Sequence, residues 1–229
     1  MKQILTVAAL SLLAIGAASA ADLIISEPVV PITDAGFDWS GFYAGLNAGY
    51  TAGQASSVGA ITGITTNVPV SGAVLGGTVG FNTQIDSFVL GLESDVAWSG
   101  ATGTAVCAAN PAFNCEGNLN WLGTIKGRAG MAFDNVLLFA SAGLAAGGVT
   151  ANIVPAAPGL TNTYSGTMTG WTVGGGVEAA VTDAMSVKAE YQYVSMGGVQ
   201  APIGTLSSTQ ASNLSSINHV VKVGVNFHF

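Results

Sequence analysis

The last segment of the chain alternates strictly between two kinds of residue. Within residues 218–229, the apolar parity holds Val221, Val223, Val225, Phe227 and Phe229, and the other parity holds Lys222, Gly224, Asn226 and His228. Because successive side chains of a β-strand point to opposite faces, this pattern predicts a strand that is apolar on one side and polar on the other. A strand of this kind, closed by an aromatic residue, is typical of the end of a transmembrane β-barrel. The segment therefore predicts a barrel in the outer membrane of a diderm bacterium.

Seven more alternating segments precede this one. The eight expected strands cover residues 40–51, 73–85, 88–99, 118–133, 136–150, 169–181, 186–194 and 218–229. Each is near or above the roughly 9 to 11 residues that a tilted strand needs to cross a bilayer. The expected fold is all-β, an eight-stranded antiparallel up-and-down transmembrane β-barrel over residues 39–229. The segment 136–150 is apolar on both parities, so its register stays open.

The connections between the segments alternate in length. Short turns are expected at residues 86–87, 134–135 and 182–185, and long loops at residues 52–72, 100–117, 151–168 and 195–217. The short connections consist mainly of turn-forming residues. Short turns at one end, long loops at the other and an even number of strands are typical of an outer-membrane barrel with both termini in the periplasm.

The start of the chain predicts export. Lys2 precedes an apolar stretch at residues 4–15, and the small residues 18–20 form a cleavage site. A transmembrane anchor is the alternative, but the stretch is shorter than the roughly 20 apolar residues that a spanning helix needs. We expect a cleaved signal peptide at residues 1–20 and a periplasmic lead-in at residues 21–38.

Parity also assigns the faces of the strands. In the segment 118–133, Leu119 and Trp121 share the outward parity with Ile125, whereas Asn120 shares the inward parity with the basic residues. Outward aromatic residues are expected to gather in two belts at the membrane interfaces. The belt near the turns comprises Phe42, Phe88, Phe133, Phe227 and Phe229, and the belt near the loops comprises Tyr50, Trp98, Trp121, Trp171 and Tyr193.

The same parity places eight charged residues in the barrel interior. They are Glu93, Asp95, Lys126, Arg128, Glu178, Lys188, Glu190 and Lys222. A Lys or Arg that faced lipid at mid-membrane would cost roughly 2 to 4 kcal/mol, which favours the inward assignment. The set could be catalytic machinery or an ion path. We favour a network of paired charges, because an eight-stranded barrel is narrow enough for side chains to fill.

Composition and isolated motifs limit the remaining functions. Only 7% of residues are charged, the formal net charge is −7, and no basic stripe indicates nucleic-acid binding. The two histidines, His219 and His228, lie in the last segment on opposite parities, so no metal site, cofactor site or His-based catalytic triad is expected. Cys107 and Cys115 could be a redox pair, but in a long loop of an exported chain we expect a disulfide that staples the loop.

Several segments carry a resemblance to a known family. They are residues 39–50, 121–130, 170–178, 188–193 and 219–229, which read WSGFYAGLNAGY, WLGTIKGRAG, GWTVGGGVE, KAEYQY and HVVKVGVNFHF. In this order they resemble the small outer-membrane β-barrel proteins of alphaproteobacteria, which include opacity-related surface antigens and are often labelled "porin family". The resemblance implies an eight-stranded barrel with exposed loops, and a C-terminal aromatic signal at Phe227 and Phe229 that the barrel-assembly machinery reads.

We therefore expect a non-enzymatic outer-membrane protein with a structural and surface-antigen role. Its expected partners are outer-membrane lipids and, during insertion, the assembly machinery. The sequence does not indicate which ligand the loops bind. A weak diffusion channel for small solutes is the first alternative. An adhesin and an outer-membrane lipid hydrolase rank lower, because the loops carry almost no charge and the sequence offers no Ser-His-Asp constellation near the outer rim.

Overall fold

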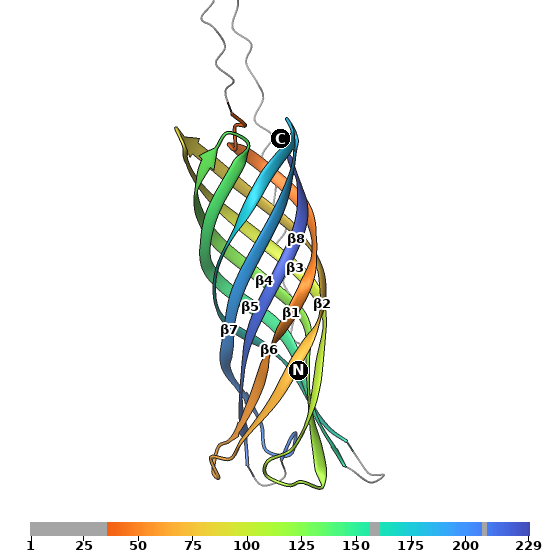
Figure 1. Cartoon of the computed structure of the whole chain (residues 1–229). Coiled ribbons are helices and arrows are strands. Elements are labelled where there is room, and N and C mark those ends of the chain that lie inside the picture. The colour runs from red at the N-terminus through yellow and green to blue at the C-terminus, as the bar shows by residue number, and fades with distance from the viewer. Residues whose placement is uncertain (1–35, 156–160, 208–209) are drawn as a thin grey trace, which may run out of the picture. The chain divides into compact units, whose positions relative to one another are not determined.

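The chain forms one closed β-barrel. A computed structural model describes residues 36–155, 161–207 and 210–229. The strands are β1 (Gly41–Gly59), β2 (Thr65–Ile85), β3 (Phe88–Val106), β4 (Phe113–Phe133), β5 (Val136–Pro155), β6 (Asn162–Thr182), β7 (Met185–Ala201) and β8 (Ser212–His228). Every strand pairs antiparallel with its neighbours in the chain, and β8 pairs with β1 (Figure 1). The prediction of an eight-stranded up-and-down barrel is confirmed.

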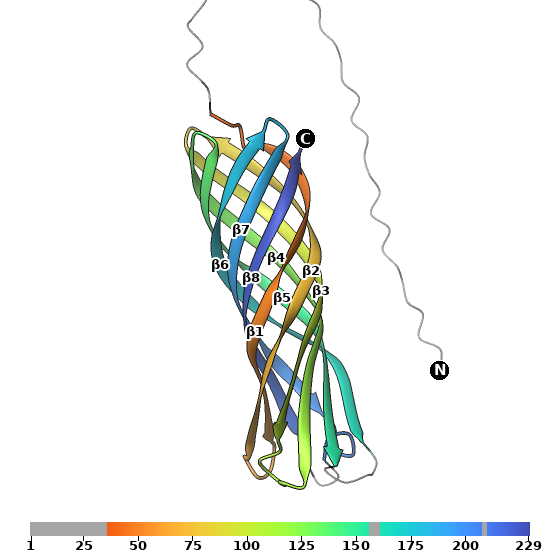
Figure 2. The same cartoon turned by 45° about the vertical axis from the view of Figure 1, so that its right-hand side comes forward.

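The two ends of the barrel differ, as the connections predicted. The C-terminus lies at the end that carries the short turns, which we call the turn end; the opposite end is the loop end (Figure 2). Asp86 and Asp134 begin two of these turns with φ values of 55° and 52°. Asp tolerates this left-handed backbone better than most residues, which explains why a connection of two residues can reverse the chain there.

The strands are longer than the sequence predicted, and the loops are correspondingly shorter. Individual strands contain 17 to 21 residues. The connections at the loop end shrink to residues 60–64, 107–112, 156–161 and 202–211. The prediction of four long loops was therefore wrong. Many outward positions of these extensions are polar, among them Thr104, Thr167 and Ser215, so the apolar parity weakens while the backbone hydrogen-bond ladder continues.

A β-bulge in β4 corrects two face assignments. Between Leu119 and Trp121, β4 advances two residues while β5 advances one, from Val149 to Gly148. The extra residue, Asn120, is exposed together with Trp121, and Leu119 is buried in the interior. Leu119 therefore faces inward and Asn120 outward, so both parity assignments were wrong. A bulge adds one residue to one strand and so reverses the parity beyond it.

The structure also decides the register of β5. Leu137 and Phe139 point inward and are buried, whereas Leu138 and Leu144 are exposed on the outer surface. Both faces of this strand are apolar because the interior at the turn end is itself apolar. There, Leu137 and Phe139 pack in a cluster with Trp39, which we call the turn-side apolar cluster; it also contains Val89 and Ala180.

The outer surface has the polarity that a bilayer requires. All ten aromatic residues of the two expected belts are at least partly exposed, Phe229 to 82% and Trp121 to 38%. The surface between the belts carries apolar side chains such as Leu46, Leu92 and Ile125. The described charged residues outside the interior are Asp38, Asp86, Asp134 and Asp183 at the turn end and Glu116 near the loop end.

The interior is layered along the barrel axis. On β4, the chain passes from Leu119 and Leu122 through Lys126 and Arg128 to the turn end. Leu119 and Leu122 belong to the loop-side apolar cluster, whose buried members are Val74, Ala97, Ala101, Leu119, Leu122, Ala145, Met168, Val194, Met196, Ala201, Leu206, Leu214 and Val220. The charged residues therefore lie between two apolar clusters.

The described part of the lead-in packs against the turn end of the barrel. Phe37 donates its backbone N–H to the carbonyl of Asp134 at 3.2 Å, and its ring packs on Trp39 and His228. Trp39 is fully buried. The expected signal peptide at residues 1–20, and the lead-in up to residue 35, lie outside the described residues. No helix in the described part of the chain is long and apolar enough to cross a membrane.

Candidate functional site

The structure brings all eight predicted interior charges together. We call this set the charged layer: Glu93 and Asp95 on β3, Lys126 and Arg128 on β4, Glu178 on β6, Lys188 and Glu190 on β7, and Lys222 on β8. None of the eight side chains is more than 4% exposed. Each takes part in at least one ion pair, so the layer holds four positive and four negative groups within contact distance of each other.

Glu93 is the centre of the charged layer. Its carboxylate lies 2.7 Å from Nζ of Lys188, 3.1 Å from Nζ of Lys126 and 3.2 Å from Nη1 of Arg128. The hydroxyl of Tyr43 donates a fourth hydrogen bond to the same carboxylate, at 2.7 Å. A buried carboxylate with this many charge-assisted donors has its hydrogen-bonding capacity filled, which offsets the cost of removing it from water.

Arg128 links Glu93 to the turn end of the barrel. Its Nη2 lies 2.8 Å from Glu178, and its Nη1 donates to the hydroxyl of Tyr43 at 3.0 Å. The guanidinium group also lies over the ring of Phe139, 4.7 Å from the centroid. Arg128 therefore binds two carboxylates while it packs on the turn-side apolar cluster, a combination suited to a planar cation with several donors.

Two further contacts complete the layer. Nζ of Lys126 lies 2.5 Å from Glu190, and Nζ of Lys222 lies 2.6 Å from Asp95. Asp95 also accepts hydrogen bonds from the amide of Asn47 at 2.6 Å and from the hydroxyl of Thr78 at 2.8 Å. Lys222 is opposite Glu190 in the β7–β8 register, yet its ion pair is with Asp95 on β3. The partners thus meet across the lumen rather than along the sheet.

A glycine is directly paired with every cation of the layer. In the strand registers, the four directly paired positions are Lys126 with Gly143, Arg128 with Gly91, Lys188 with Gly224 and Lys222 with Gly49. A Cβ at Gly91 would lie 2.2 Å from the side-chain oxygen of Asn82 and 3.2 Å from Cγ of Arg128. The missing side chain leaves space into which the long basic side chain can fold.

Sequence reasoning missed the neutral groups that surround the charges. Tyr43, Asn47 and Thr78 donate to Glu93 or Asp95, and Ser186 and Asn226 each donate to Glu178 at 2.6 Å. The signal was present, since all five are polar residues on the inward parity of their strands. Parity shows that they face the lumen, but it does not show which charge each one reaches.

One contact set resembles a catalytic triad in composition. Ser186 lies 3.0 Å from Nε2 of His228 and donates to Glu178, while the same Nε2 lies 3.6 Å from Glu178. In a triad, the acid holds the other ring nitrogen and so leaves Nε2 free to accept the serine proton. Here the acid and the serine share one nitrogen, and all three side chains are buried. Nδ1 of His228 is buried and has no hydrogen-bond partner among the described residues, so the set lacks the geometry of a triad.

Two other predicted sites lie at opposite ends of the barrel. Cys107 and Cys115 form a disulfide with an S–S distance of 2.00 Å at the loop end, as predicted. Phe227 and Phe229 point outward at the turn end, where the backbone N–H of Phe229 donates to the carbonyl of Phe42 at 2.9 Å. Their role as an assembly signal stays a prediction. Among the described residues, no group of His, Cys, Asp or Glu is arranged to hold a metal ion.

The closed ring of strands, the aromatic belts and the inward charges define an integral outer-membrane β-barrel. Residues 6–229 match the family described as outer membrane protein beta-barrel domain, and the chain belongs to this family. The 31 kDa outer-membrane immunogenic protein of Brucella melitensis is 32% identical, over 93% of both chains. The 22 kDa outer membrane protein of Rhizobium leguminosarum is 31% identical, over 66% of this chain and 63% of its own length.

A solved structure agrees with the fold. The outer membrane protein OprG from Pseudomonas aeruginosa aligns with a TM-score of 0.52 at 11% identity, covering 85% of this chain and 99% of its own. The outer membrane is therefore the location of this protein, and the predicted resemblance to alphaproteobacterial surface proteins is confirmed.

Proposed function

We propose that the protein is a non-conducting, non-enzymatic structural barrel that presents a braced surface at its loop end. One observation carries the proposal: the charged layer fills the lumen between two apolar clusters, and no member of the layer is more than 4% exposed. Ion transport needs a hydrated path, and an eight-stranded barrel is about wide enough for side chains alone. Moving ions through this lumen would require several ion pairs to separate.

The surface-antigen part of the proposal rests on the loop end. Ile61 and Ile203 at the tips of two connections are 77% and 61% exposed, and the disulfide holds a third connection. The relatives from Brucella are named immunogenic proteins. We propose that this chain is likewise a surface antigen. Its constant partners would be outer-membrane lipids and, during insertion, the assembly machinery.

Conductance of single molecules in a planar bilayer tests the proposal. The wild-type barrel, refolded and shown to be inserted, should give negligible current or small irregular events at voltages where an open porin in the same bilayer gives steady steps. Steady, ion-selective steps from the wild type would instead favour the alternative, a narrow diffusion channel lined by the charged layer. In that case Arg128→Ala should change the ion selectivity and leave the thermal stability nearly unchanged.

A further inference from the structure

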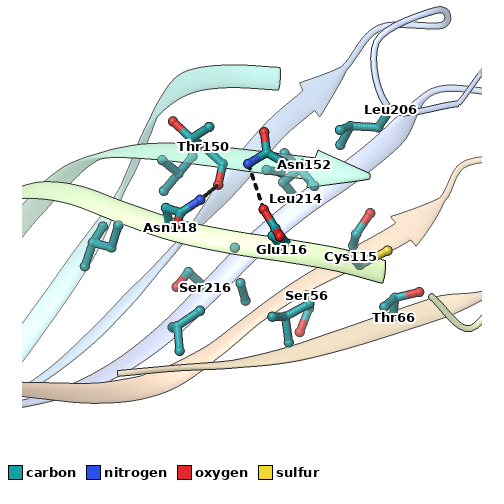
Figure 3. A pocket seen from close by; sticks show the side chains of 18 of the residues that line it. Ser56, Thr66, Cys115, Glu116, Asn118, Thr150, Asn152, Leu206, Leu214 and Ser216 are labelled. Atoms are coloured by element: carbon teal, nitrogen blue, oxygen red, sulfur yellow. Dashed lines mark hydrogen bonds between the residues drawn. The ribbon is translucent and has the colours of Figure 1, made fainter. Parts of the chain in front are cut away.

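A second feature of the interior lies on the loop side of the charged layer. It is a hollow with a cavity volume of about 70 Å³, open on one side, between the loop-side apolar cluster and the connections (Figure 3). On β4 its lining residue Leu119 precedes Lys126, and on β8 Leu214 precedes Lys222. The hollow is therefore separated from the turn end by the whole charged layer, and it has the position of a closed-ended cavity.

The inner wall of the hollow is apolar. Its buried apolar side chains come from four strands and one connection: Val68 and Val70 on β2, Leu119 on β4, Met168 on β6, Leu214 on β8 and Leu206 in the segment 202–211. Residues this far apart in the sequence meet only because the sheet closes. A small apolar molecule that enters from the exterior solution and binds against this wall is removed from water, which favours binding.

The polar groups of the hollow are almost all neutral. The hydroxyl groups of Thr66 and Ser216 are buried inside the barrel, whereas Ser56, Asn118, Thr150 and Asn152 border the hollow from the outward parity of their strands. Glu116 is the one charged residue among the described lining residues; it also lies on the outward parity, where it accepts a hydrogen bond from Asn152 at 3.2 Å (Figure 3). None of the described lining residues is basic. A charged ligand would lose its hydration without gaining a partner of opposite charge, so the wall selects against ions.

The mouth of the hollow is already braced. A wider space of about 370 Å³ adjoins it, and the two share Ser57, Thr66, Cys115, Ile153 and Leu206. Gln210 accepts hydrogen bonds from the backbone N–H groups of Ile61 and Thr62 at 2.9 and 3.0 Å, and so joins two connections. Ala108, next to the disulfide, donates its N–H to Thr66 at 3.1 Å. These contacts fix the described residues of the mouth in place without a ligand, which lowers the ordering cost of binding.

From these observations we infer that the loop half of the barrel is a binding site for a small, uncharged, largely apolar molecule, such as a monocyclic aromatic compound, that enters from the external solution. Only together with the wider space that it joins does the hollow reach the roughly 300 to 1,000 Å³ that is usual for small-molecule sites, so the ligand would occupy both. The inference goes beyond the proposed function, since a barrel closed to ions can hold a ligand on one side of its charged layer. Binding and conductance are therefore tested separately.

Methyl NMR of the protein in nanodiscs of deuterated lipid provides the test. Toluene is titrated while the methyl groups of Leu119, Met168 and Leu214 report on the hollow, and those of Leu46 and Leu92 report on the lipid-facing surface. We expect saturable shifts with one dissociation constant at the interior methyls and small, non-saturating shifts outside. Benzoate, which has the same ring and a negative charge, should bind at least about tenfold more weakly because no cation is available to pair with it.

Variants locate the site. Val70→Phe should fill the hollow and weaken toluene binding by at least about tenfold, because the new ring takes the apolar contact area. Leu214→Trp fills it from a different strand and should act in the same way if Val70→Phe does not fold. Val96→Phe adds the same ring to the lipid-facing surface, where Val96 is 61% exposed, and should leave binding unchanged.

Three results of the toluene experiments would overturn the inference, and a fourth result concerns lipid. These are equal, non-saturating shifts at interior and exterior methyls, equal affinities for toluene and benzoate, and toluene binding that survives both filling variants. Contacts between the interior methyls and the acyl chains of protonated lipid would also overturn it, because the hollow would then be a lipid site rather than a site for an external molecule.

Discussion

At the scale of single residues, the interior charges are held by more than their opposite charges. Glu93 has three cations and a tyrosine hydroxyl around it, whereas Asp95 has one cation and two neutral donors. Removing one member of such a layer leaves its partner charged and out of water. The cost depends on how many other donors that partner keeps.

Arg128→Ala tests the layer where one cation joins two carboxylates. Among the described residues, Arg128 is the only Lys or Arg within ion-pair distance of Glu178; the substitution removes it and leaves space beside Phe139. We expect a destabilisation of about 3 to 5 kcal/mol, the range for breaking a buried ion pair. Urea unfolding of the barrel in lipid vesicles, followed by tryptophan fluorescence, measures it. Asp183→Ala in an exposed turn is the control; a change of less than about 0.5 kcal/mol in both variants would contradict a paired layer.

Substitutions at Lys222 and Asp95 separate the contribution of charge to stability from the contribution of packing. Lys222→Met alone leaves the Asp95 carboxylate buried with its two neutral donors, and should cost about 3 kcal/mol or more. The double variant Lys222→Met, Asp95→Asn removes both charges with little change in volume. We expect it to recover a large part of that loss in the same unfolding assay, because buried pairs gain little over neutral groups. If the destabilisation of the double variant equals the sum of those measured for Lys222→Met and Asp95→Asn alone, the two residues do not interact.

At the scale of secondary-structure elements, the last strand combines two roles. β8 closes the ring against β1, and its final residues place aromatic side chains on the outer surface at the turn end. Phe229 is bonded to Phe42 through its backbone, so the closure itself does not need the aromatic ring. The ring is free to act as an interfacial anchor and as the signal that the family resemblance implies.

Phe229→Asp tests the terminal signal against a matched position. Phe88, at the start of β3, also points outward at the turn end and is 60% exposed, compared with 82% for Phe229. If the terminal aromatic residue is read during assembly, Phe229→Asp should lower the amount of folded protein in the outer membrane several-fold and Phe88→Asp should lower it much less. Quantitative blotting of outer-membrane fractions measures both. Equal levels of the two variants would indicate that the belt, not the terminus, matters.

At the scale of the whole molecule, closure of the sheet into a ring determines how the barrel unfolds. The closed sheet has no free edge strand from which the fold could unravel strand by strand. Unfolding should therefore be slow until the whole ring opens.

Gel mobility measures this property. In mild detergent without boiling, the protein should migrate as a compact species, and after boiling it should move to the position of the unfolded chain. The disulfide alone should not produce this difference, so the double variant Cys107→Ser, Cys115→Ser should show the same two bands. Identical mobility before and after boiling, for protein shown to be folded, would contradict a closed barrel.

The sequence by itself determined the architecture and the faces of most strands. A bilayer forces lipid-facing side chains to be apolar, and a period of two then fixes which residues point inward, so Lys126, Glu178 and the rest of the charged layer could be found from parity. The disulfide followed in the same way from two cysteines in one exported loop.

Only the tertiary structure decided where the strands end and what the interior residues contact. Many outward positions of the strand extensions at the loop end are polar, so hydrophobic alternation did not predict these extensions. The bulge at Asn120 reversed the parity of β4 on its loop side. The pairing of Lys222 with Asp95 and the apolar hollow depend on which strands face each other across the lumen. That relation arises when the ring closes, and no local pattern along the chain encodes it.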